Sequence, residues 1–475
     1  MRPLEILILP TLAAAMAALL VPLPPVRRFP WGRGLMALPV LGLLLIGAHL
    51  VAEGYRWQMV PAYALMGLCM LLDLRPPGMR AKRAIAVFGA LGGVLALALA
   101  SALPVALPVF ALPAPGGTYA VGTTYLDLVD TARPEPFTAD TQDHRELLVQ
   151  FWYPAAPVAG RQPVAYVERP RAVVAVAADG AGVRLPAFVL DHLALVRTHA
   201  YRDVPLAASQ SRYPVLIFSH GYLSFGVQNT VLMEELASHG YIVAGINHPY
   251  EALVTSYPDG RDVPANDAAL AALFERGVLV HPRASLRIWT EDTRFVLDQL
   301  EDIDAGRIAG PFAGRLDLAR VGMLGMSFGG TTACQVCAED ARCRASLDLD
   351  GDLYGARCMD GKPFAFLLSS ERRPPQCLAG ASGDTYLFTV RNTKHRDFGD
   401  FPLYSPLMPL TGYFGTIDAQ RMTGIMNAYT RAFFDRYLRE RPAPLLDGPA
   451  PEYPEVDYRA CPIGPWGAAT AYELH

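Results

Sequence analysis

The chain has 475 residues, of which 52% are hydrophobic and 18% are charged, with a formal net charge of −4 and a mean hydropathy of +0.22. The length allows more than one domain, and the small net charge without long runs of one sign argues against a nucleic-acid partner. The mean hydropathy is high for a soluble enzyme because apolar residues are concentrated in the first 112 positions.

Four apolar stretches open the chain, at about residues 4–22, 35–51, 57–72 and 84–110. A helix that crosses a membrane needs about 20 apolar residues. The first and third connections are basic, whereas the second carries only Arg56, offset by Glu53. By the positive-inside rule, this pattern predicts four spans with both termini outside. We therefore expect a transmembrane helical anchor over residues 1–112 in the inner (cytoplasmic) membrane and an extracytoplasmic domain over residues 113–475.

Short apolar runs alternate with helical patterns along the rest of the chain. The strands are expected at 119–128, 146–153, 214–219, 241–248, 320–324, 345–349, 363–369 and 385–390. The helices are expected at 186–197, 231–238, 285–303, 329–340 and 423–438. This alternation predicts an α/β fold, in which helices cover both faces of a mostly parallel sheet. Substrate should then bind beyond the carboxyl ends of the strands.

The segment Gly325-Met-Ser-Phe-Gly329 follows the apolar strand at 320–324 and matches the pattern G-x-S-x-G. In such a strand-to-helix turn the serine hydroxyl stands above the sheet, and the glycines let the strand and helix approach closely. Ser327 is therefore the predicted nucleophile. The backbone N–H of Phe328 would point at the carbonyl oxygen that Ser327 attacks.

A serine hydroxyl needs a base to accept its proton, and that base needs a carboxylate to orient it. In α/β-hydrolases the chain order is serine, then carboxylate, then histidine. Of the ten histidines, only His395 and His475 follow Ser327, and His475 is the last residue. His395 is therefore the predicted base.

The carboxylate should stand at the end of the strand that follows the nucleophile helix. Asp350 directly precedes Gly351, where the expected strand at 345–349 ends, so its side chain can reach the sheet edge. Asp348 lies two residues earlier on the same face and remains the alternative. Asp350 is favoured because Asp348 would lie deeper in the sheet.

Negative charge develops on the substrate carbonyl oxygen during the attack and needs hydrogen-bond donors. Besides Phe328, the loop after the strand at 214–219 can provide one. In His220-Gly-Tyr222 the glycine lets the backbone come close, so the N–H of Tyr222 is the predicted second donor of the oxyanion hole. His220 is expected to hold this loop by hydrogen bonds.

Three segments resemble the platelet-activating factor acetylhydrolase family of α/β-hydrolases, in its plasma and intracellular type II branch. They are Phe218-Ser-His-Gly221, Gly325-Met-Ser-Phe-Gly-Gly330 and His395-Arg-Asp-Phe-Gly-Asp-Phe401, within a similarity over roughly residues 117–440. The resemblance implies a triad of Ser327, Asp350 and His395. It also implies hydrolysis of short or oxidised acyl esters of phospholipids, as by a 1-alkyl-2-acetylglycerophosphocholine esterase. Met326 stands where the family usually has histidine.

The predicted function is therefore that of a serine ester hydrolase that works through an acyl-enzyme on a lipid or another ester. The alternatives are a general carboxylesterase or cutinase-like polyester hydrolase, and a non-catalytic binding domain on a membrane anchor. No Walker A, H-E-x-x-H or correctly placed Rossmann pattern occurs, so no metal or nucleotide cofactor is expected. The oligomeric state is left open. So is the disulfide pairing among Cys334, Cys337, Cys343, Cys358, Cys377 and Cys461.

Overall fold

The computed structural model describes residues 1–20, 37–73, 83–180, 184–276, 283–353, 361–372 and 384–461. The chain divides into two compact units. The helical unit contains Met1–Ala111, Ala187–Val196 and Tyr404–Leu407, and the sheet unit contains the remaining residues.

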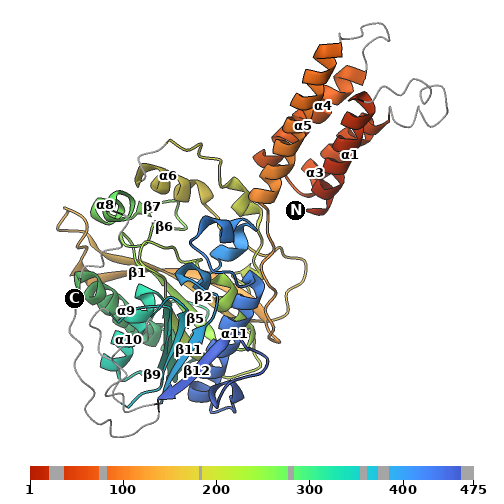
Figure 1. The fold of residues 1–475 in the computed structure, drawn as a ribbon. Coiled ribbons are helices and arrows are strands. Elements are labelled where there is room, and N and C mark those ends of the chain that lie inside the picture. Colours follow the sequence, from red (N-terminus) through yellow and green to blue (C-terminus); the bar gives the residue numbers. More distant parts are fainter. Residues whose placement is uncertain are drawn as a thin grey trace. The chain divides into compact units, whose positions relative to one another are not determined.

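The sheet unit is built on one large sheet (Figure 1). Its strand order is β12-β11-β10-β9-β8-β4-β5-β2-β1-β3. Its strands are β1 (Ala120–Pro134), β2 (His144–Ala155), β3 (Ala200–Arg202), β4 (Tyr213–Ser219), β5 (Ile242–Asn247), β8 (Leu316–Met326), β9 (Cys343–Leu349), β10 (Phe364–Ser369), β11 (Thr385–Val390) and β12 (Val456–Cys461). The pairs from β5 through β4, β8, β9 and β10 to β11 are parallel, whereas β2 and β12 run antiparallel to their neighbours. A separate hairpin joins β6 (Val254–Ser256) to β7 (Asp262–Pro264).

Helices cover both faces of this sheet, as the α/β prediction requires. The helices of the sheet unit are α6 (Pro170–Gly180), α7 (Thr230–Ser238), α8 (Asp267–Arg276), α9 (Arg283–Asp304), α10 (Phe328–Glu339) and α11 (Ala419–Arg439), of which α9 and α10 cover one face and α7 and α11 the other. Side chains of β4 alternate between two cores. Val215 and Ile217 pack with α9 and α10, whereas Leu216 and Phe218 pack with α7 and α11. The mostly parallel α/β-hydrolase arrangement predicted from the sequence is therefore confirmed.

The main error in the predicted secondary structure concerns the segment before β4. The sequence predicts irregular chain there with one helix at 186–197, but the structure has α6 at Pro170–Gly180 and only a short 3₁₀ helix at Asp191–Leu195. Further 3₁₀ turns follow β11, at His395–Phe398, Phe401–Tyr404, Met408–Thr411 and Pro444–Leu446.

The helical unit contains α1 (Pro3–Leu20), α3 (Leu38–Ala52), α4 (Val60–Asp73) and α5 (Arg83–Ala106), with a 3₁₀ turn at Trp57–Met59. Its core is apolar and includes Ile8, Leu12, Ile46, Met59 and Met66. The four apolar stretches therefore do form helices that pack on one another.

A buried ionic cluster lies at one end of these helices. Arg56 is only 2% exposed, and its Nε lies 2.8 Å from Oε1 of the fully buried Glu5. Arg2 also pairs with Glu5, while His49 Nδ1 lies 2.9 Å from Glu53 Oε2. The charge count above treated Arg56 and Glu53 as loop charges outside a membrane, but both take part in this cluster.

No helix among the described residues is long and apolar enough to cross a membrane. For example, α3 and α4 have 15 and 14 residues, which at 1.5 Å per residue amounts to about 22 and 21 Å, against about 30 Å of hydrocarbon. The predicted four-span anchor, and with it the multi-pass location in the inner membrane, is therefore wrong. The prediction was based on the number of apolar residues in each stretch, which does not show where a helix begins and ends.

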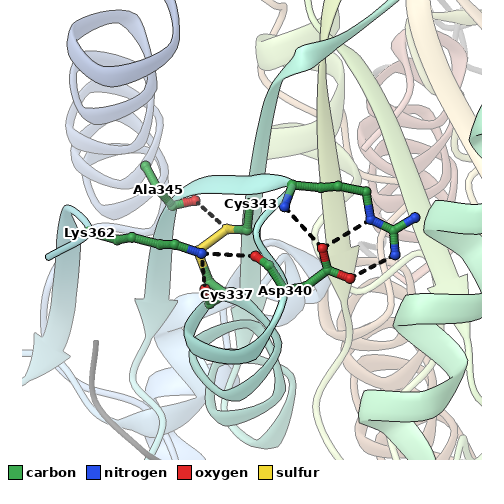
Figure 2. Close-up of a disulfide and its surroundings, with 6 residues drawn as sticks. Cys337, Asp340, Cys343, Ala345 and Lys362 are labelled. Carbon is green, nitrogen blue, oxygen red and sulfur yellow. Dashed lines mark hydrogen bonds and ion pairs between the residues drawn. A yellow bond between two sulfur atoms is a disulfide. The ribbon is translucent and has the colours of Figure 1, made fainter. Parts of the chain in front are cut away.

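A disulfide joins Cys337, near the end of α10, to Cys343, at the start of β9 (Figure 2). Lys362 Nζ donates to the backbone carbonyls of Cys337 at 2.6 Å and Asp340 at 2.8 Å, which satisfies acceptors at the helix end. Cys334 is a free, buried cysteine, whereas Cys358 and Cys377 lie outside the described residues. The disulfide thus ties the helix after Ser327 to the strand before Asp350.

Candidate active site

Ser327 occupies a sharp turn between β8 and α10. Its backbone has φ 56° and ψ −122°, a conformation that costs energy for a residue with a side chain. Glycine is required at positions 325 and 329 because a side chain would clash with the neighbouring backbone. A Cβ on Gly325 would lie 2.1 Å from the carbonyl carbon of Gly329, and one on Gly329 would lie 2.0 Å from the carbonyl oxygen of Ser219. This strained turn therefore depends on glycine at both positions, as the G-x-S-x-G pattern implies.

Asp350 and His395 come together at the carboxyl edge of the sheet. His395 Nδ1 lies 2.7 Å from Asp350 Oδ2, and the other carboxylate oxygen accepts the N–H of Ser369 at 2.6 Å. Asp350 is fully buried, whereas the His395 side chain is 34% exposed. Because a carboxylate oxygen only accepts, Nδ1 carries the proton and Nε2 of the neutral ring is left as an acceptor.

The turn that carries His395 is fixed from within. Asp397 Oδ2 accepts the N–H of Lys394 and the N–H of Gly415, both at 2.7 Å. These bonds hold the 3₁₀ turn His395–Phe398 in place after β11. The position of His395 is therefore fixed by hydrogen bonds within its own loop.

Asp348 is directed elsewhere. It is fully buried, and its Oδ1 accepts the N–H of Gly351 at 2.7 Å. Burial raises the pKa of this carboxyl well above its usual value. A Cβ on Gly330 would lie 2.0 Å from Asp348 Oδ1, so this carboxyl packs against the start of α10. Of the two candidate carboxylates, Asp350 is the one that contacts His395.

The loop proposed for the oxyanion hole lies beside Ser327. A Cβ on Gly221 would lie 3.5 Å from Ser327 Cβ. The rings of Tyr222 and Phe328 meet edge to face at a centroid distance of 5.6 Å. Ser327 Oγ makes no hydrogen bond to any residue that the structure describes. Hydrogen bonds between a nucleophile and its base are often long or misaligned before substrate binds.

Arg372 is a neighbour of the Asp350–His395 pair that the sequence analysis missed. Its Nε lies 3.6 Å from Asp350 Oδ2 and its Nη2 lies 3.4 Å from His395 Nδ1, and it also pairs with Asp352. Arg372 follows β10 by three residues. The rule that sites gather at the carboxyl ends of parallel strands could have drawn attention to it.

A second group of serine, histidine and aspartate lies behind the His220–Tyr222 loop. His248 Nδ1 lies 2.9 Å from Asp292 Oδ2, and His248 Nε2 lies 3.3 Å from Ser219 Oγ. We call Ser219, His248 and Asp292 the buried trio, and Ser327, Asp350 and His395 the edge trio. The sequence analysis gave no role to any of the buried trio, because the three residues lie far apart in the chain.

A cavity of about 420 Å³ adjoins the continuation of the same loop. Phe225, Gly226 and Val227 line one part of it, and Asn247 at the end of β5 lines another. Charged residues of both signs, including Arg169 and Asp203, complete the wall. The lining is mixed in polarity, and it includes neither the edge trio nor Tyr222 and Phe328.

Comparison with known proteins agrees with the resemblance noted in the motifs. Residues 110–441 match the family model described as "Platelet-activating factor acetylhydrolase, isoform II". The platelet-activating factor acetylhydrolase of Cavia porcellus is 26% identical over 51% of this chain and 61% of its own length. A probable 1-alkyl-2-acetylglycerophosphocholine esterase of Arthroderma benhamiae is 24% identical over 73% of this chain and 93% of that protein.

A solved structure is also similar. The ferulic acid esterase from Streptomyces cinnamoneus is 32% identical, with a TM-score of 0.60 over 74% of this chain and 99% of that one. The chain spans less than two thirds of the length of the mammalian acetylhydrolases that it matches, for example 57% of the one from Bos taurus. The family model covers most of the sheet unit, and the family resemblance seen in the motifs is confirmed. The chain belongs to the platelet-activating factor acetylhydrolase, isoform II, family.

Proposed function

We propose that the chain is a serine ester hydrolase in which Ser327 is the nucleophile, His395 the base and Asp350 the orienting carboxylate. The observation that carries the proposal is the 2.7 Å contact between His395 Nδ1 and Asp350 Oδ2 at the sheet edge where the strained turn presents Ser327. We further propose that residues 113–475 form the catalytic domain, since the residues of the proposed site all fall within them.

In the first half of the reaction, Ser327 Oγ attacks the ester carbonyl carbon while its proton passes to His395 Nε2. The carbonyl double bond opens, and the negative charge on its oxygen is stabilised by the backbone N–H groups of Tyr222 and Phe328. Asp350 stabilises the imidazolium that forms. When the carbonyl re-forms, the bond to the alkoxy oxygen breaks, and His395 gives its proton to the departing alcohol.

In the second half, water takes the place of the alcohol. His395 accepts a proton from the water, whose oxygen attacks the acyl carbon of the ester on Ser327. The same N–H groups stabilise the second oxyanion. Collapse of this intermediate returns the proton from His395 to Ser327 Oγ and releases the acid, so the enzyme is regenerated without a cofactor.

For substrate, we propose phospholipids with short or oxidised acyl groups. The family and the printed names of the relatives support this class. A general carboxylesterase is the second candidate. It is favoured by the similarity to a ferulic acid esterase, which covers nearly all of that chain.

A substrate panel separates these candidates. The full chain and its Ser327→Ala variant would be assayed on phosphatidylcholines with sn-2 acyl groups of graded length, and on methyl ferulate. The phospholipid proposal predicts high kcat/KM for the acetyl ester and a steady fall as the chain lengthens. Faster turnover of methyl ferulate than of any phospholipid would favour the second candidate. Absence of Ser327-dependent hydrolysis from the whole panel would contradict both.

A further inference from the structure

His220 lies directly after β4 and uses both of its ring nitrogens. Nε2 is 3.2 Å from the backbone nitrogen of His248, and Nδ1 is 2.8 Å from the carbonyl oxygen of Gly221. A backbone N–H can only donate, so Nε2 must be an acceptor, and the single ring proton is on Nδ1. Nδ1–H therefore donates to the Gly221 carbonyl.

The His220 ring stays neutral, so it carries only this one proton on Nδ1. His220 is fully buried, and burial together with the nearby His248 ring lowers its pKa to about 3. A second proton would also displace the N–H of His248 from Nε2. The ring thus stays neutral with one fixed donor.

The carbonyl of Gly221 and the N–H of Tyr222 belong to one peptide unit. A trans peptide is planar, so its C=O and N–H point in opposite directions. A group that holds the carbonyl consequently sets the direction of the N–H. Ser224 N–H donates to the same carbonyl at 3.0 Å, but it belongs to the loop itself, whereas His220 connects the carbonyl to the layer behind.

That layer is rigid and buried. The His248 ring stacks on Trp289 at a centroid distance of 3.9 Å and an angle of 7°, and its Nδ1 donates to Asp292. Asp292 accepts from Arg145 Nε at 3.1 Å and Nη2 at 2.8 Å. Asp292, His248 and Arg145 are all nearly or fully buried. The backbone N–H that fixes the His220 tautomer is therefore held by side chains with little freedom to move.

We propose that His220, backed by His248, is a positioning residue that holds the Gly221 carbonyl and thereby aims the Tyr222 N–H at the oxyanion of the substrate. This inference rests on the proposed function and concerns the same site. It assigns the buried trio a role in orienting a donor, with no chemistry of its own.

The test replaces the ring in two ways in the full chain. His220→Phe keeps the volume but removes the donor, and His220→Asn puts an amide N–H near the position of Nδ1. Loss of one oxyanion donor costs about 10²–10³ in kcat, so His220→Phe should lose about that much, with a nearly unchanged KM. His220→Asn should regain most of kcat although its melting temperature falls, because His248 N–H loses its acceptor.

Two further variants keep the test decisive. His192→Phe replaces another buried histidine, outside the site, and should keep the native kcat. If His220→Phe does not fold, His220→Gln is compared with His220→Asn. Glutamine carries its amide one methylene too far to reach the Gly221 carbonyl, so its kcat should be at least about tenfold below that of His220→Asn.

Native kcat in His220→Phe, or equal kcat in the asparagine and glutamine variants, would overturn the inference. Fluorophosphonate labelling separates this failure from a failure of the proposed function. A native chain that is neither labelled nor hydrolytic would contradict the proposed function. A labelled, active native chain with an unaffected His220→Phe variant would contradict only the role of His220.

Discussion

The sheet unit contains two groups of serine, histidine and aspartate at the carboxyl end of its parallel strands. In both, histidine Nδ1 faces a fully buried aspartate, at 2.7 Å in the edge trio and 2.9 Å in the buried trio. The two trios differ in the solvent exposure of the histidine and in the backbone conformation of the serine. The His395 side chain is 34% exposed and the His248 side chain is fully buried. Ser327 has a positive φ in a tight turn, whereas Ser219 is the last residue of a regular strand.

The surroundings of the two aspartates differ as well. Asp292 forms ion pairs with Arg145 and Arg133. Burial by itself would raise the pKa of the Asp292 carboxyl, but Arg145 and His248 outweigh it and lower this pKa below its usual value. Asp350 accepts a backbone N–H and the N–H of the His395 ring, and its arginine neighbour is farther away, with Arg372 Nε 3.6 Å from Asp350 Oδ2. A serine, a histidine and an aspartate linked by hydrogen bonds are therefore not sufficient for catalysis. Catalysis also needs access for a substrate and donors for its oxyanion, and the three residues of the buried trio are almost entirely covered.

The largest expected effect comes from exchanging the two serines for alanine. Ser327→Ala should reduce kcat by about 10⁵–10⁶, because the proposed nucleophile is lost. Ser219→Ala removes one buried hydrogen bond, worth about 1 kcal/mol, and should reduce kcat by less than about tenfold. Steady-state hydrolysis of a short-chain ester by the two folded variants measures both. Similar losses in the two variants would remove the distinction between the trios.

The carboxylates give the next largest difference. Asp350→Asn should lower kcat by about 10⁴ with little change in KM, because His395 would no longer be held in the required tautomer. Asp348→Asn is the matched control, since an asparagine oxygen can still accept the Gly351 N–H. A greater loss in the control than in Asp350→Asn would show that the wrong carboxylate has been assigned.

Asp292→Asn should act on stability more than on catalysis. It leaves the buried Arg145 without one of its two carboxylate partners, and breaking a buried ion pair costs about 3–5 kcal/mol. Urea unfolding, followed by the fluorescence of buried tryptophans, should show a lower midpoint. The loss of kcat per folded molecule should be far smaller than in Asp350→Asn. An unchanged unfolding midpoint would refute the structural role given to the buried trio.

Removing the disulfide probes the support of the edge trio. The bond closes a short loop, with a sequence separation of six, for which chain entropy gives about 2 kcal/mol. The double variant Cys337→Ala/Cys343→Ala should therefore unfold at a lower temperature. Because the bond lies at the ends of α10 and β9 opposite to Ser327 and Asp350, kcat below the unfolding range should stay close to native. A large loss of kcat in the folded variant would disprove this separation.

The last prediction concerns acid stability, with no expected effect on catalysis at neutral pH. An unfolded histidine binds a proton near pH 6.5, whereas the folded chain protonates His220 only near a pKa of about 3. Between these values unfolding takes up a proton, so the free energy of unfolding falls as the pH falls. In His220→Asn the slope of this decline should decrease by about one proton, or about 1.4 kcal/mol per pH unit. The free energy of unfolding would be measured by urea titration from pH 4 to pH 6. An equal pH dependence in the native chain and in His220→Asn would contradict this prediction.

The sequence was a good guide where local chemistry decides the structure. Gly325 and Gly329 are needed because a Cβ at either position would clash with the backbone. The chain order serine, carboxylate, histidine leaves only His395 and His475 as partners for Ser327. Alternating apolar runs likewise predicted the parallel sheet. These features depend on neighbours in the chain or on a fixed order, both of which a single sequence displays.

Long-range burial of charge was not predictable in this way. Arg145 and Asp292 are 147 positions apart, and nothing in their local sequences indicates that they pair inside the protein. The same applies to Arg56 and Glu5, whose burial the loop-charge count could not anticipate. Such pairs are set by how whole elements pack, so apolar runs and charge counts alone overstated the case for a membrane anchor.

The most direct test of the central claim is to find which serine reacts. The native chain and Ser219→Ala would be treated with a fluorophosphonate, digested and analysed by mass spectrometry. We predict a single adduct on Ser327 in both proteins and none in Ser327→Ala. An adduct on Ser219, or an unmodified Ser327 in a folded native chain, would contradict the assignment of the edge trio.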